Sequence, residues 1–146
     1  MCTMNKIELV EAIDLLIGKG FTFEESKDLI DKYKGAYKNG RRTRHGEVVE
    51  FLFTLEEWVD WWYTPDDTGE PRINNRGNKP KNWCMGRYLD RGPYHKDNTY
   101  LVTVRDNLLH ARANYITKEH YYAHKKFFET YTIPVTESES VINDPE

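Results

Sequence analysis

Residues 82–114 read NWCMGRYLDRGPYHKDNTYLVTVRDNLLHARAN, and this stretch carries the strongest fold signal in the chain. Residues 83–87 suit a strand, and Asp90-Arg91-Gly92-Pro93 is typical of a turn. A second short strand is expected at residues 100–102, and a helix begins near Thr103. The stretch therefore predicts a strand, a turn, a strand and a helix, in that order.

Two helices are predicted before this stretch. Residues 5–17 carry apolar side chains at helical spacing, with Asn5 as the cap. Thr22-Phe23-Glu24-Glu25 is a capping box that opens a second helix, which is expected to end near Lys34. The short connection between them predicts an antiparallel helical hairpin over residues 5–34. The polar, basic residues 35–46 are interpreted as a solvated loop or as a loop that contacts phosphate.

The middle of the chain predicts a short strand, a helix and a long loop. Residues 47–53 suit a strand, and Thr54-Leu55-Glu56-Glu57 is a capping box before a tryptophan-rich turn. We favour the core for these tryptophans over a platform on which bases stack. Residues 64–81 are rich in Pro, Gly, Asp and Asn, so they predict a long irregular loop.

The end of the chain predicts one more helix and a tail. Residues 117–131 form the helix, which Pro134 stops, and residues 135–146 are acidic and expected to be disordered. We therefore expect an α+β protein with an N-terminal helical hairpin, a small ββα-type finger and a C-terminal helix. Residues 1–134 would form a single domain, with the hairpin at 5–34 and the finger region at 47–131.

Composition limits the classes of protein. The chain has 146 residues, a net charge of −3 and two cysteines, Cys2 and Cys84, without a paired spacing. A structural disulfide or an all-cysteine zinc site is not expected. The sequence contains neither a long apolar segment nor a signal-peptide pattern, so we expect a cytoplasmic protein with no membrane partner.

Charge is unevenly distributed along the chain. The last ten residues carry four acids and no base, so without them the net charge would be −3 + 4 = +1. Between residues 71 and 96 the only acid is Asp90. This segment is a candidate surface for nucleic acid. Its bases are Arg72, Arg76, Lys79, Lys81, Arg87, Arg91 and Lys96.

The predicted strand, turn, strand and helix also follow the order of a ββα metal finger. In such a site an acid or His from the turn and a His or Asn from the helix hold a divalent cation. A separate His acts as general base on water.

The residues of this stretch resemble a family. Trp83-Cys84-Met85-Gly86-Arg87, Asp90-Arg91-Gly92-Pro93-Tyr94, Asn98 and Asn107 are similar to small bacteriophage proteins related to HNH (ββα-metal) endonucleases. The motif there is of the type Arg-x-Asp-x-x-Gly-x-Tyr-x-x-x-Asn before a helix. The tryptophan-rich helix after Thr54 also resembles their upstream helix, so the resemblance covers roughly residues 54–114.

The resemblance implies roles for particular residues. Asp90 would bind Mg²⁺ or another divalent metal, and His110 or Asn107 would be the ligand from the helix. Asn98 would fix the loop through hydrogen bonds to the backbone. Arg87, Tyr88 and Leu89 stand directly before the acid, where active enzymes have a His, and the nearest His, His95, lies five residues after Asp90. His95 is therefore the one candidate base, and we favour loss of cleavage, with Arg87 contacting phosphate.

Simpler interpretations stand beside these. Gly92-Pro93-Tyr94 is also a plain turn with an aromatic packed behind it, and Asp90 a turn acid. His110 is also a structural histidine beside Leu108 and Leu109. His120 and His124 share one helix face at a spacing that suits a metal, without the pattern of a metalloprotease.

Three functions follow. The first is an HNH-like phage protein that binds DNA without cutting it, with affinity that falls steeply with salt. The second is a small phage protein that binds and inhibits a host defence, transcription or replication protein. The aromatic content and the acidic tail suit that second role. The third is an active metal-dependent nicking endonuclease.

Overall fold

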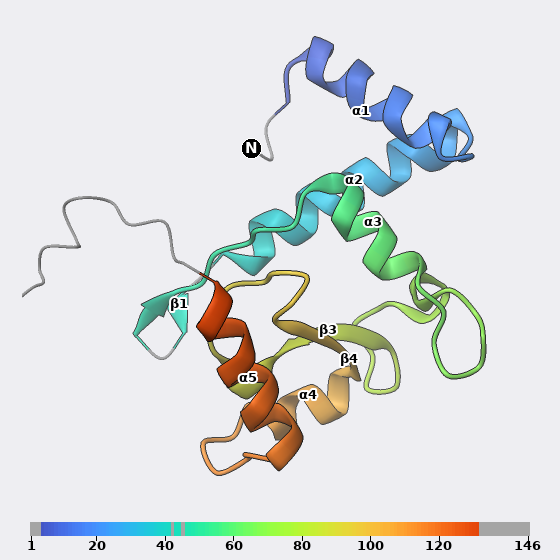
Figure 1. Ribbon diagram of the computed structural model, residues 1–146. Helices are drawn as coiled ribbons and strands as arrows, with labels where there is room; N and C mark the ends of the chain where they lie inside the picture. Colours follow the sequence, from blue (N-terminus) through green and yellow to red (C-terminus); the bar gives the residue numbers. More distant parts are fainter. Residues whose placement is uncertain (1–3, 42, 45, 132–146) are drawn as a thin grey trace, which may run out of the picture.

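A computed structural model of the chain describes residues 4–41, 43–44 and 46–131 and shows an α+β arrangement (Figure 1). This confirms the expected fold class. The predicted tail, residues 135–146, lies outside the described residues. The elements in chain order are α1 (Lys6–Gly18), α2 (Phe23–Gly40), β1 (Thr43–Arg44), β2 (Glu47–Val48), α3 (Leu55–Tyr63), the 3₁₀ turn η1 (Arg72–Asn75), β3 (Trp83–Arg87), the 3₁₀ turn η2 (Tyr88–Asp90), β4 (Thr99–Thr103), α4 (Val104–His110) and α5 (Lys118–Thr130).

The first three helices each begin with a capping box. Asn5, Thr22 and Thr54 accept a hydrogen bond from the backbone N–H three residues later, and the Glu at that position bonds back to the cap. Each pair satisfies two backbone N–H groups that a helix start leaves without a partner. The predicted starts of these helices are confirmed.

Two predicted boundaries were wrong. Helix α2 runs to Gly40 and not to Lys34, because Ala36 and Tyr37 pack against the core and this burial outweighs the poor helix propensity of Gly35. The strand expected over residues 47–53 is limited to β2, which pairs with β1. Beyond it Phe51 forms only an isolated parallel bridge with Tyr94.

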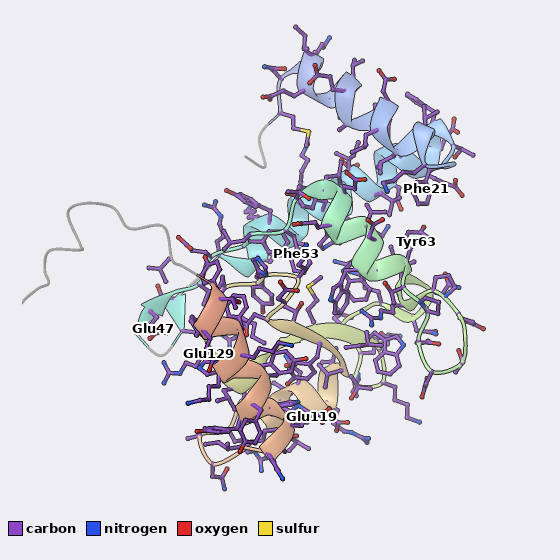
Figure 2. All side chains as sticks on the ribbon, viewed as in Figure 1. Phe21, Glu47, Phe53, Tyr63, Glu119 and Glu129 are labelled. Carbon is purple, nitrogen blue, oxygen red and sulfur yellow. The ribbon has the colours of Figure 1, made fainter. Side chains whose placement is uncertain are left out.

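The core lies where α2, α3 and the segment after β2 meet. Trp58 and Trp62 are 1% and 3% exposed, so the placement of the tryptophans in the core is confirmed. Tyr33 on α2 contacts Trp58 and Phe51 edge-on and donates a hydrogen bond from its hydroxyl to the carbonyl of Phe53. Figure 2 shows how densely side chains fill the space beside Phe53.

The strand, turn, strand and helix predicted over residues 83–110 are present. β3 and β4 pair antiparallel from Trp83↔Thr103 to Arg87↔Thr99, and α4 follows directly. Helix α5 packs along the turn η2, on the side of the β3–β4 hairpin away from α1 (Figure 1). Among the described residues no helix is long and apolar enough to cross a membrane.

Candidate functional site

The turn after β3 has an unusual backbone. Leu89 and Asp90 both adopt positive φ values, 58° and 53°. This conformation is costly for residues other than glycine and persists only when surrounding contacts impose it. The turn must therefore be held by its neighbours.

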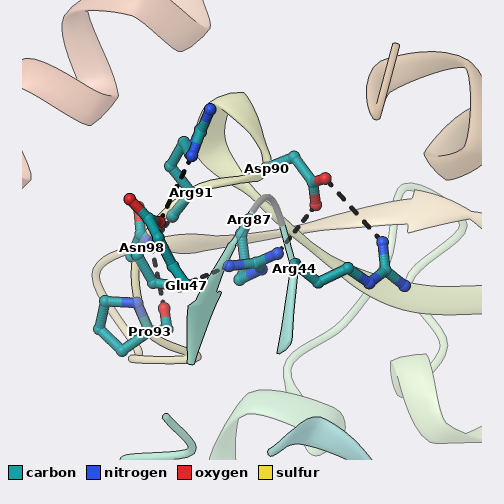
Figure 3. A network of polar contacts seen from close by, with 8 residues as sticks. Arg44, Glu47, Arg87, Asp90, Arg91, Pro93 and Asn98 are labelled. Carbon is teal, nitrogen blue, oxygen red and sulfur yellow. Dashed lines mark hydrogen bonds and ion pairs between the residues drawn. The ribbon is translucent and has the colours of Figure 1, made fainter. Parts of the chain in front are cut away.

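Arg87 supplies much of that hold. Its side chain is only 4% exposed, Nη1 donates to the carbonyl oxygen of Gly92 at 2.6 Å, and Nη2 donates to Oδ1 of Asp90 at 3.0 Å (Figure 3). The guanidinium also lies 5.3 Å from the centre of the Tyr94 ring. Arg87 is thus bonded inside the protein and is not part of the exposed basic surface.

Asp90 lies between two arginines. One carboxylate oxygen accepts from Arg87, and the other lies 3.9 Å from Nη1 of Arg44 in β1 (Figure 3). The carboxylate is 18% exposed. Asp90 therefore links the finger turn to the β1–β2 ribbon.

Asn98 holds the other half of the turn. It is fully buried, and its Nδ2 donates to the carbonyl oxygens of Arg91 and Pro93 at 2.8 and 2.9 Å (Figure 3). These are side-chain bonds to backbone of the kind that fix a loop. Gly92, with φ +80°, leaves no room for a Cβ, because Phe128 and the Asn98 amide lie against it.

His95 packs against the end of helix α5 and the residue that follows it. Its ring lies 5.2 Å from that of Phe127 and 5.6 Å from that of Tyr131, measured between ring centres. Its Nδ1 accepts a hydrogen bond from the backbone N–H of Asp97. These contacts give His95 a structural place in the turn.

His110 belongs to an aromatic cluster beneath α5. Its Nδ1 lies 2.9 Å from the hydroxyl of Tyr100, and its ring stacks on Tyr115 with centres 4.1 Å apart. His120 of α5 completes the cluster, with its ring 4.4 Å from that of Tyr100. Burial lowers the pKa of His120, and the neighbouring His110 lowers it further. Burial also raises the pKa of Tyr100.

The donors present do not assemble a metal site within the described residues, where no three His, Cys, Asp or Glu side chains are grouped to hold an ion. Both oxygens of Asp90 face arginines, and Nδ1 of His110 is bonded to Tyr100. Asn107 lies on α4, where its backbone carbonyl oxygen accepts a hydrogen bond from the backbone N–H of Ala111. Mg²⁺ at Asp90 stays a prediction.

The basic residues that were predicted to bind nucleic acid divide into internal and surface residues. The guanidinium of Arg72 lies over Trp61 at 4.5 Å and donates to its carbonyl oxygen. Arg91 and Lys96 are exposed but paired with Glu47 at 3.4 Å and Glu57 at 3.9 Å.

Arg76, Lys79 and Lys81 differ from these paired bases. They share the loop before β3, and none forms an ion pair with a carboxylate in the described part of the chain. The backbone N–H of Arg105 donates to the carbonyl oxygen of Pro80, which holds this loop against the start of α4. We call residues 76–81 the basic loop.

A groove of about 650 Å³ adjoins the basic loop, between α2, α3 and β3. Its volume is typical of ligand sites. The residues that line it are Lys32, Gly35, Ala36, Asn39, Gly40, Phe51, Trp58, Trp62, Arg76, Gly77, Asn78, Trp83, Cys84, Met85 and Tyr94. Burial raises the pKa of the Cys84 thiol to about 11, so this cysteine is in its neutral form.

Sequence reasoning missed this groove because its residues come from segments far apart in the chain. The one available signal was the proximity of Arg76 and Trp83 on either side of a Pro- and Gly-containing loop. Comparisons with protein-family models, with curated proteins and with solved structures gave no match.

Proposed function

We propose that the chain is a bacteriophage protein of the infected cell's cytoplasm that binds DNA through an HNH-like ββα arrangement and does not cleave it. The order of β3, turn, β4 and α4 supports the scaffold. Both carboxylate oxygens of Asp90 face arginines, and His95 packs against Phe127 and Tyr131; these contacts support the loss of cleavage.

The basic loop is the observation that carries this proposal. Lys79 and Lys81 are exposed, and neither has an acidic partner among the described residues. A lysine that is already paired with a carboxylate adds little to DNA affinity when it meets a phosphate. A lysine without such a partner releases condensed counterions from the DNA when it binds. In a chain of net charge −3, such a local surface decides where a polyanion binds.

Mobility shift of labelled duplex and single-stranded DNA at two salt concentrations tests the proposal. Lys79→Gln with Lys81→Gln should weaken binding and reduce the salt slope by about 1.4 on single strands, the value for two lost phosphate contacts. Lys125→Gln with Lys126→Gln, two exposed lysines on α5, makes the same change of charge elsewhere. Absence of binding by the unaltered protein even at low salt would refute the proposal.

The outer face of α1 favours a second candidate, binding of a host or phage protein. Ile7, Val10 and Ile17 are 71%, 55% and 45% exposed, and Phe23 at the start of α2 is 51% exposed. Apolar side chains gathered this way at the end of the molecule are typical of protein contact sites. In Figure 1 α1 projects from the rest of the chain.

Affinity capture from host lysate with Val10→Asp as the matched variant tests this candidate. A defined host protein retained by the unaltered chain and lost with Val10→Asp would support it. Retention that is equal for both proteins, or no retention at all, would count against a role for α1.

A further inference from the structure

The groove beside the basic loop is positively charged although the chain as a whole is acidic. Among the described residues that line it, the ionisable ones are Lys32, Arg76, Cys84 and Tyr94, and none of them carries a carboxylate. Lys32 is paired with Asp28 at 2.6 Å, which leaves Arg76 as the cation that the groove itself holds. This charge is suited to an anion.

The guanidinium of Arg76 has N–H donors that no side chain among the described residues engages. Its guanidinium lies 5.4 Å from the Trp58 ring and 5.2 Å from the Trp62 ring, and no side-chain hydrogen bond or ion pair engages it within the described residues. It is half-buried, and burial lowers its pKa, although an arginine keeps its charge. A guanidinium has five N–H donors, so a half-buried one without an acceptor is poised for phosphate or carboxylate.

The aromatic ring of Trp83 lies beside Arg76 in the groove. The backbone of Arg76 forms an isolated parallel bridge with that of Trp83, so the two residues lie side by side, and both line the groove. The indole is fixed by a hydrogen bond from Nε1 to Asp66 at 3.2 Å. Trp83 and Tyr94 are partly exposed, so they offer ring surface where the indole of Trp58 does not.

Resting on the proposed function, we propose that this groove binds one unstacked nucleotide of single-stranded DNA. Arg76 contacts a phosphate of that nucleotide, the base lies against Trp83 and Tyr94, and the next phosphates follow the basic loop past Lys79 and Lys81. Stacking on aromatic rings beside a basic track is the general means of holding single strands. Because the positively charged side chains continue along the loop, they favour single-stranded DNA over a free small anion.

Quenching of tryptophan fluorescence by a short oligothymidylate measures this binding. Arg76→Met removes the charge and keeps apolar bulk over the tryptophans, so affinity for the oligothymidylate should fall about tenfold or more. Arg72→Met is the matched control, because Arg72 stacks on Trp61 but does not line the groove. Its affinity should stay within about twofold of the unaltered protein.

Gly35→Leu tests the groove without removing a charge. Gly35 lies within helix α2 at the groove, and a Cβ there meets nothing within 4 Å. Leucine favours the helix more than glycine does, so this variant should fold and place its side chain in the groove mouth. Oligothymidylate binding should weaken, whereas duplex binding should not change.

The outcomes separate the two proposals. Unaltered oligothymidylate affinity in both Arg76→Met and Gly35→Leu would overturn the groove inference, while sensitivity to Lys79→Gln with Lys81→Gln would still support DNA binding. No binding of any DNA would refute the proposed function itself. Thymidine monophosphate bound as tightly as the oligothymidylate would show a site for free nucleotides and overturn the single-strand assignment.

Discussion

Arg87 illustrates how burial changes the meaning of a charge. In the sequence it is one of seven bases in a run with a single acid, and it suits a phosphate contact. In the fold it spans the turn, with one amino group on Gly92 and the other on Asp90. Its bonds help to hold Leu89 and Asp90 at positive φ.

Arg87→Met should lower the free energy of unfolding by about 3 kcal/mol, because the carbonyl oxygen of Gly92 loses its donor and Asp90 loses the nearer of its two arginines. Urea denaturation measures the change. Arg112→Met, at an exposed position after α4, should stay within about 0.5 kcal/mol of the unaltered protein. Equal effects of the two substitutions would contradict a structural role for Arg87.

At the scale of elements, helix α5 packs on the rest of the molecule through two histidine rings that can be protonated, His120 and His124. His120 is buried against Tyr88, Tyr100 and Tyr115, and its Nδ1 has no hydrogen-bond partner among the described residues. Burial lowers the pKa of His120 and, further along the same helix, of His124. The folded state therefore favours the neutral form of both rings.

The melting temperature should consequently fall as pH drops from about 7 towards 5. An unfolded histidine gains its proton near pH 6.5, whereas the folded one resists protonation until a lower pH, so the unfolded state binds more protons in this window. His120→Phe keeps an aromatic ring that cannot be protonated, and its melting temperature should vary less with pH than that of the unaltered protein. Identical pH profiles would show that His120 has no part in the effect.

At the scale of the whole molecule, the finger turn meets the groove at Tyr94, which ends the turn and lines the groove. The turn around Asp90 is closed by arginines and by α5, whereas the groove opens beside the basic loop. Arg87, Asp90 and Asn98, which hold the turn together, do not line the groove. The motif that the sequence resembles places its acid two residues after the arginine, where this chain has Leu89.

Supercoiled plasmid incubated with the protein and Mg²⁺ or Mn²⁺ should therefore remain uncut. Asp90→Asn is the informative variant, with its folding checked by circular dichroism. Cation-dependent nicking that Asp90→Asn abolishes would contradict this expectation and assign the chain to the active endonucleases. Nicking that survives the substitution would point to a different site or to a contaminant.

The sequence by itself determined what depends on neighbouring residues. The capping boxes at Asn5, Thr22 and Thr54 are local signals, since their hydrogen bonds join residues three apart. The strand that ends at Arg87 was also predicted from neighbouring residues. The α+β class and the order of the elements follow from these signals.

Only the tertiary structure decided which charges are internal and where a groove opens. The end of α2 at Gly40 depends on packing by Tyr37, and the burial of Arg87 depends on a turn that folds back over it. Among the described residues no carboxylate pairs with Lys79 or Lys81, while Arg91 and Lys96 meet acids from β2 and α3. Such pairings join residues distant in sequence, and the spacing of residues along the chain holds no information about them.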